Sequence, residues 1–64
     1  EDKVISFALE KDIQLVGVSC VDRVHIFEYT EEDDIMSHVA CIDKANITEV
    51  LFVNYSLTLQ LTPG

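Results

Sequence analysis

The chain has 64 residues, of which 48% are hydrophobic and 25% charged, and this composition is typical of a packed globular chain rather than a disordered one. The length predicts one small domain, or a fragment of one, over residues 1–64. Twelve acidic residues against four basic ones give a net charge of −8, which argues against nucleic acid as a partner because phosphate contacts need clustered Lys and Arg. No apolar run approaches the roughly 18 residues of a membrane-spanning helix.

The first half of the chain predicts three strands separated by polar turns. Residues 4–9, "VISFAL", are rich in β-branched and aromatic side chains and end at the polar break "EKD", so they predict a strand followed by a turn. The run "IQLVGVSCV" predicts a second strand. After Asp22-Arg23, "VHIFEY" predicts a third strand, with Val24 and Ile26 on one face and the intervening side chains on the other.

The segment from Thr30 to Ala45 has two interpretations. Thr30 is a candidate N-cap, the acidic run 31–34 suits a helix N-terminus, and apolar residues recur at helical spacing, which together predict a helix at Glu31–Asp43. Alternatively, the acidic run is a turn and residues 35–42 form a strand, because Ile, Val, Cys, His and Ser are poor helix formers. The fold we expect is a mainly β, small antiparallel β-sandwich-like domain of five to six strands, with an α+β fold carrying that helix as the alternative.

The chain closes with two more expected strands, "ITEVLFV" and "SLTLQLT", joined at Asn54-Tyr55. In the last strand Leu57, Leu59 and Leu61 alternate with polar residues and share one face. A small sheet has few ways to cover its edges, so this strand is a candidate interaction edge that pairs with another chain. Homo-oligomerisation would stabilise so small a domain in the same way.

The cysteines and histidines allow several chemistries. Cys20 and Cys41 are either two reduced, buried thiols or a disulfide, which would contribute about 3 kcal/mol by closing a loop of about 20 residues. Together with His25 and His38 they supply four potential zinc ligands, but without the spacing of a zinc motif. We expect no metal and no cofactor.

Both asparagines of the chain lie in glycosylation acceptor triplets, at Asn46 and Asn54. Such triplets and a disulfide would fit an extracellular protein, whereas reduced thiols favour the cytoplasm. The sequence therefore does not decide between an extracellular and a cytoplasmic location.

Catalytic signatures are missing from the sequence. No nucleophile lies in a glycine-flanked turn and no loop is rich in glycine, so we expect the protein not to be an enzyme. The acidic run 31–34 lacks the spaced ligands and the glycine of a calcium loop.

Two stretches resemble known families. The segment "QLVGVSCVDRVHIFEY" resembles the two central strands of a WD-repeat propeller blade, with Phe27-Glu28 where the family has Trp-Asp. The two strand pairs "VISFALEKDIQLVGV" and "ITEVLFVNYSLTLQL" follow one another at about 45 residues, near the period of such blades.

A second resemblance covers more of the chain. "ISFALEKDIQLVGV" is similar to the opening of PHR-type β-sandwich domains, and "EVLFVNYSLTLQLTPG" is similar to a later strand pair of that group. This resemblance implies an all-β, non-enzymatic module that binds protein partners beside ubiquitin-ligase components, with residues 35–42 as a strand.

Two functions are therefore expected. The first is a non-enzymatic protein–protein interaction module that uses an exposed strand edge. The alternative is a small acidic inhibitor or phosphate mimic that occupies a basic site on its target, which the net charge of −8 favours. The partner is another protein in both cases, and a basic one in the second.

Overall fold

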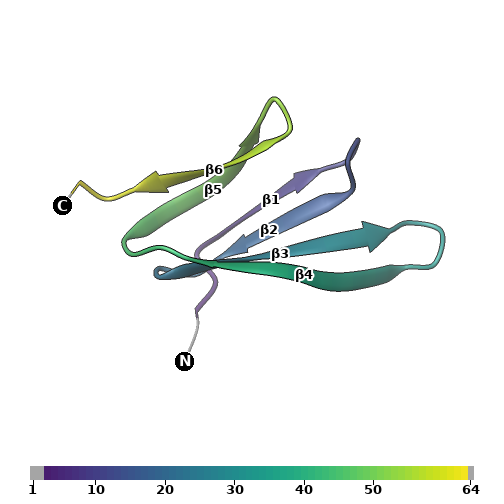
Figure 1. Cartoon of the computed structure of the whole chain (residues 1–64), viewed down its shortest axis with the longest axis horizontal. Helices are drawn as coiled ribbons and strands as arrows, with labels where there is room; N and C mark the ends of the chain where they lie inside the picture. The colour runs from purple at the N-terminus through teal and green to yellow at the C-terminus, as the bar shows by residue number, and fades with distance from the viewer. Residues whose placement is uncertain (1–2, 64) are drawn as a thin grey trace.

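The computed structural model describes residues 3–63, which form six strands and no helix in that range (Figure 1). Within it, no helix is long and apolar enough to cross a membrane. The strands are β1 (Ser6–Glu10), β2 (Leu15–Ser19), β3 (Arg23–Thr30), β4 (Ile35–Asp43), β5 (Ile47–Val53) and β6 (Ser56–Leu61).

The strands form two antiparallel sheets. β1 to β4 make a four-stranded meander in chain order, and β5 and β6 make a separate hairpin. The expected mainly β, sandwich-like fold is therefore confirmed. The molecule is flat, with extents of 42 × 29 × 15 Å.

The alternative helix at Glu31–Asp43 is wrong. The acidic residues form the turn between β3 and β4, and β4 pairs with β3 from Arg23↔Asp43 to Thr30↔Ile35. The β-branched and polar side chains of residues 35–42 suit a strand better than a helix interior. Pairing along the whole of β3 outweighs the local helix signals, because isolated helices of this length are marginal in water.

Turns between the strands use asparagines in the left-handed backbone region. Asn46 has φ 65° between β4 and β5, and Asn54 has φ 48° between β5 and β6. Asparagine tolerates this conformation better than most residues. Tyr55 follows at φ 65°, where a bulky side chain is uncommon, so its neighbours must hold it there.

The β5–β6 hairpin packs on one face of the four-stranded sheet, over β1 and β2. The backbone N–H of Val50 donates a hydrogen bond of 3.2 Å to Ser6 Oγ. Gly17 lies under the hairpin, so that an added Cβ would stand 2.9 Å from Leu57 Cδ1 and 3.2 Å from Val50 Cγ2. A glycine here lets the two layers approach closely.

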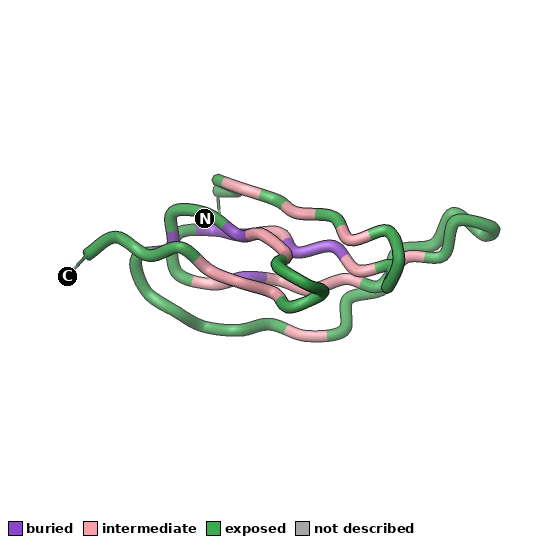
Figure 2. Tube along the Cα trace, turned by 90° about the horizontal axis from the view of Figure 1, so that it is seen from above, coloured by how far each residue is buried: buried purple, intermediate pink, exposed green. Residues whose placement is uncertain are grey.

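The core is small and lies largely between these two layers. Its buried apolar members are Val16, Cys20, Val24, Ile47 and Val50, and Figure 2 shows the buried segments in the interior of the stack, with the β3–β4 turn extending beyond the rest. Ser19 is also buried, and its hydroxyl donates to the carbonyl of Cys20 at 2.8 Å.

Strand register assigns side chains to the two faces of the sheet. Ala8, Gly17 and Ile26 are direct cross-strand partners, so they share the face on which the hairpin lies, which we call the inner face. The opposite face, which we call the outer face, carries the rows Phe7–Val18–His25–Cys41 and Leu9–Val16–Phe27–His38. The alternation expected for residues 24–29 is present.

Candidate functional site

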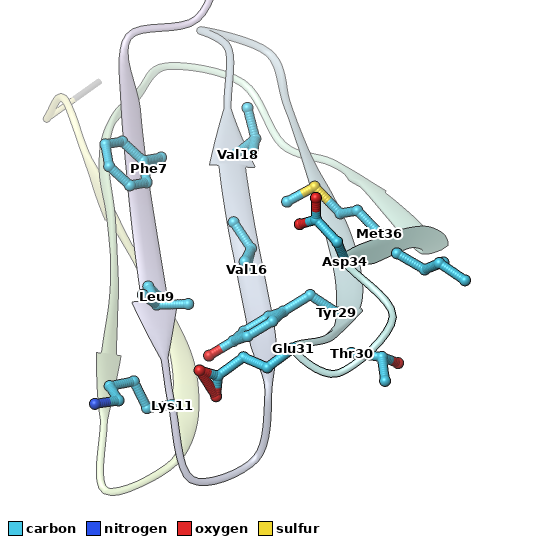
Figure 3. Close-up of a pocket in the computed structure, with 11 residues that line it drawn as sticks. Phe7, Leu9, Lys11, Val16, Val18, Tyr29, Thr30, Glu31, Asp34 and Met36 are labelled. Carbon is cyan, nitrogen blue, oxygen red and sulfur yellow. The ribbon is translucent and has the colours of Figure 1, made fainter.

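The outer face of the sheet forms an open apolar groove with a volume of about 640 Å³. Phe7 and Leu9 on β1 are 70% and 51% exposed, whereas Val16 beside them is 7% exposed. Tyr29 and Met36 continue the groove toward the β3–β4 turn. Figure 3 shows these side chains on the side of β1 and β2 turned away from the hairpin. A monomer seldom leaves so continuous an apolar surface uncovered unless it binds something.

One end of the groove is acidic. Glu31 and Asp34, from the turn between β3 and β4, line it together with Lys11 at the other side of the opening. The four carboxylates of residues 31–34 are exposed. A ligand in the groove would therefore meet apolar side chains along the strands and negative charge at the β3–β4 end.

A histidine pair lies farther along the outer face. His25 Nδ1 and His38 Nε2 are 3.1 Å apart, and the tautomers decide which nitrogen donates. The ring of His38 also packs edge-on to Phe27, with ring centroids 5.2 Å apart. The pair forms because β4 contains a bulge at this point, where the register with β3 shifts between Ile26 and Phe27.

The cysteines are placed differently from one another. Cys20 is buried at the end of β2, and its N–H donates to the carbonyl of Arg23, whereas Cys41 is exposed on β4 opposite His25. Of the two thiols expected to be buried if reduced, Cys20 is buried and Cys41 is not. The alternative, a disulfide between them, stays a prediction. In residues 3–63, no three His, Cys, Asp or Glu side chains converge in a way that could hold a metal ion.

In the reduced protein, Cys41 should react with iodoacetamide under native conditions, while Cys20 should react only after unfolding because its side chain is 3% exposed. Intact mass should show one added label before urea and two after it. A Cys41→Ser variant should take up none before urea. No label after urea without reductant would instead demonstrate the disulfide.

Both acceptor asparagines lie in exposed turns. Asn46 and Asn54 are exposed at the two ends of β5, where a glycan would not enter the interface between the layers. Glycosylation at both positions stays a prediction, and a glycan mass from the native source would test it.

The closing strand turns its leucines toward the four-stranded sheet. Leu57 and Leu59 are half-buried and pair with Phe52 and Val50, and Leu61 is 41% exposed. The leucines therefore contribute to the packing of the hairpin. The backbone edge of β6 opposite β5 stays a candidate interaction edge.

A hydrogen bond between two side chains joins the two layers at their turns. The hydroxyl of Tyr55, in the β5–β6 turn, donates to Asp12 Oδ2 in the β1–β2 turn at 2.9 Å. This hydrogen bond raises the pKa of Tyr55 above its ordinary value, with smaller contributions from desolvation and from the charge of Glu10. The bond also gives a reason for the uncommon backbone of Tyr55, since the left-handed turn aims its side chain at β1 and β2.

An Asp12→Asn variant should lower the pKa of Tyr55. Because the folded-state pKa is raised, the stability from this bond is present below the ordinary tyrosine pKa of about 10 and is lost as pH rises through the folded-state value. Ultraviolet titration in a Tyr29→Phe background would follow Tyr55 alone. An Asp33→Asn control removes the same charge from the β3–β4 turn, which does not contact Tyr55, and should shift the midpoint much less. Equal shifts in both variants would contradict the hydrogen bond.

The chain matches no protein-family description, no curated protein and no solved structure. Both resemblances, to PHR-type domains and to propeller blades, therefore stay predictions.

The residues of the groove were not among the site residues expected from the sequence. Phe7, Leu9, Val16 and Val18 lie in nearly continuous apolar runs, where both faces of a strand look hydrophobic. An antiparallel strand with one solvated face normally alternates apolar and polar residues. The continuous apolar runs were therefore a sign that both faces of the sheet are apolar.

Proposed function

We propose that the protein is a non-enzymatic protein–protein interaction module that receives its partner on the outer face of the four-stranded sheet. The observation that carries this proposal is the uncovered apolar groove, in which Phe7 and Leu9 remain more than half exposed. Burying each of these side chains against a partner would contribute about 1.5–3 kcal/mol. A few such side chains often supply most of the binding energy of an interface.

The edge of β4 extends this surface. Eight of its nine residues are exposed, and the stretch from Ile35 to Ile42 contains no charge, no proline and no glycine. Natural sheets normally protect such an edge with charged residues or proline. An extended segment of a partner can therefore add to the sheet at β4 while its side chains enter the groove.

A comparative pull-down tests the proposal. Proteins bound by the wild type should be lost with the Phe7→Lys/Leu9→Lys variant and retained by a Val21→Lys/Val4→Lys variant. Val21 and Val4 are 58% and 56% exposed and lie outside the groove lining, and both double variants change the net charge equally. Identical sets of bound proteins from the two variants would contradict the proposal.

The second candidate function is an inhibitor that occupies a basic site, and the acidic end of the groove supports it. Glu31 and Asp34 at the groove and the net charge of −8 favour it. Measuring partner binding as a function of salt concentration distinguishes the two functions. Exposed charge contacts are screened at high ionic strength, whereas apolar contacts are not. Binding that persists at high salt supports the interaction module, and binding that collapses supports the inhibitor.

A further inference from the structure

Two of the hairpins, β1–β2 and β5–β6, repeat each other. β5 begins at Ile47, 41 residues after β1 begins at Ser6, and β6 begins at Ser56, 41 residues after β2 begins at Leu15. Both pairs are antiparallel hairpins. The β5–β6 hairpin therefore corresponds to the β1–β2 hairpin of the four-stranded sheet.

The correspondence extends to the side chains. Counted from the turn, the second and fourth cross-strand pairs of β1–β2 are Leu9–Val16 and Phe7–Val18. The second and fourth pairs of β5–β6 are Phe52–Leu57 and Val50–Leu59. Each set is an apolar quartet on one face of its hairpin. We call them the first quartet and the second quartet.

The second quartet already has a partner within the molecule. Val50 and Leu57 lie over Gly17 on the inner face of the sheet, and Val50 is 2% exposed. The third pair from the turn in β1–β2 is Ala8–Gly17, which leaves room for them. The chain itself therefore demonstrates that such a quartet packs on the far face of a neighbouring hairpin.

The first quartet has no hairpin packed over it, and Phe7 and Leu9 are 70% and 51% exposed, whereas Val16 is 7% exposed. The accessible surface of the chain is 4587 Å², against about 4,100 Å² expected for a folded monomer of this mass. The larger accessible surface of this chain is consistent with an apolar outer face that no other part of the chain covers.

From this repetition, and resting on the proposed function, we infer that a second copy of the chain covers the first quartet in a head-to-tail arrangement. The first quartet of one copy packs on the exposed side of the β5–β6 hairpin of the next copy, where Leu51, Val53 and Thr58 lie between polar neighbours. This continues the stacking that the second quartet makes inside one chain.

A head-to-tail contact is heterologous, so each copy has one donor face and one acceptor face, and the copies form a ring or an open chain. Copies with a charge of −8 repel one another. Assembly should therefore strengthen as salt screens that repulsion.

Light scattering after size exclusion, from micromolar to millimolar protein, tests the inference. The wild type should assemble with concentration, and the two substitutions of the Phe7→Lys/Leu9→Lys donor variant should weaken association by about 100-fold or more. The Val53→Lys acceptor variant should likewise associate more weakly than the wild type, since Val53 is 47% exposed on the side of the hairpin that would receive the first quartet. Circular dichroism confirms that each variant is folded, and Val21→Lys is the control that should assemble like the wild type.

Mixing the two defective variants gives the sharpest result. In a head-to-tail contact the donor variant keeps an intact acceptor face and the acceptor variant keeps an intact donor face, so their mixture should form a discrete dimer.

Three outcomes would overturn the inference: a wild type that stays monomeric throughout, a Val53→Lys variant that assembles normally, or a Val21→Lys variant that fails to assemble. These outcomes concern self-association alone. The pull-down, which tests the proposed function, is a separate measurement and could still support it.

Discussion

Replacing Ile47 with alanine should destabilise the protein by about 2–5 kcal/mol, the range for truncating a buried isoleucine. Ile47 is 1% exposed at the start of β5, and its N–H donates to the carbonyl of Val21 at 2.8 Å. It therefore anchors the hairpin to the β2–β3 turn. A domain of this length has a small margin of stability, so the variant should be largely unfolded at physiological temperature.

Urea unfolding followed by circular dichroism measures this effect, with Ile42→Ala as the matched control. Ile42 is 43% exposed on β4, so the same truncation removes much less buried surface there. Its midpoint should lie close to that of the wild type. Equal losses at the two positions would mean that the interior does not lie between the sheet and the hairpin.

Replacing Gly17 with valine should separate the two layers. A Cβ at Gly17 already stands 2.9 Å from Leu57 Cδ1 and 3.2 Å from Val50 Cγ2, and the two methyl groups of valine need further space. Overpacking of this kind costs about 1–3 kcal/mol. The Gly17→Val variant should lower the urea midpoint, and its hairpin amides should exchange with solvent faster than those of the sheet.

A Gly17→Ala variant shows whether steric overlap with Leu57 causes the loss of stability. The tip of Leu57 can rotate away from one added Cβ, so Gly17→Ala should cost less than Gly17→Val. In a Leu57→Ala background the Gly17→Ala substitution should cost less than in the wild type, because the closer of the two contacts is gone and alanine reduces the freedom of the unfolded chain. Additive effects of Gly17→Ala and Leu57→Ala would refute the close contact.

Local sequence rules predicted most of the strands but could not decide residues 31–43. Thr30 and the acidic run imitate a helix start, and this signal comes from four or five neighbours along the chain. The decisive interactions are the pairs from Arg23↔Asp43 to Thr30↔Ile35, which join the segment to β3, outside the segment itself. A window limited to residues 31–43 leaves out the β3 residues with which the segment pairs.

The candidate site was predicted less well than the fold. The period-two pattern showed that Leu57, Leu59 and Leu61 share a face, but not that this face turns toward Gly17. The approach of His25 to His38 depends on a bulge in β4, and periodicity cannot reveal an extra residue in one strand. The groove depends on which side of the sheet the hairpin covers, a choice made by tertiary packing.

The meander topology also has a kinetic consequence. Every ladder joins strands that follow one another in the chain, so each hairpin can close early over a short loop. Contacts between the layers, such as Val50 to Ser6 and Tyr55 to Asp12, span 44 and 43 residues and cost more chain entropy to close. We therefore expect docking of the β5–β6 hairpin to be a late event in folding, before which the nascent sheet would expose both of its faces to other chains.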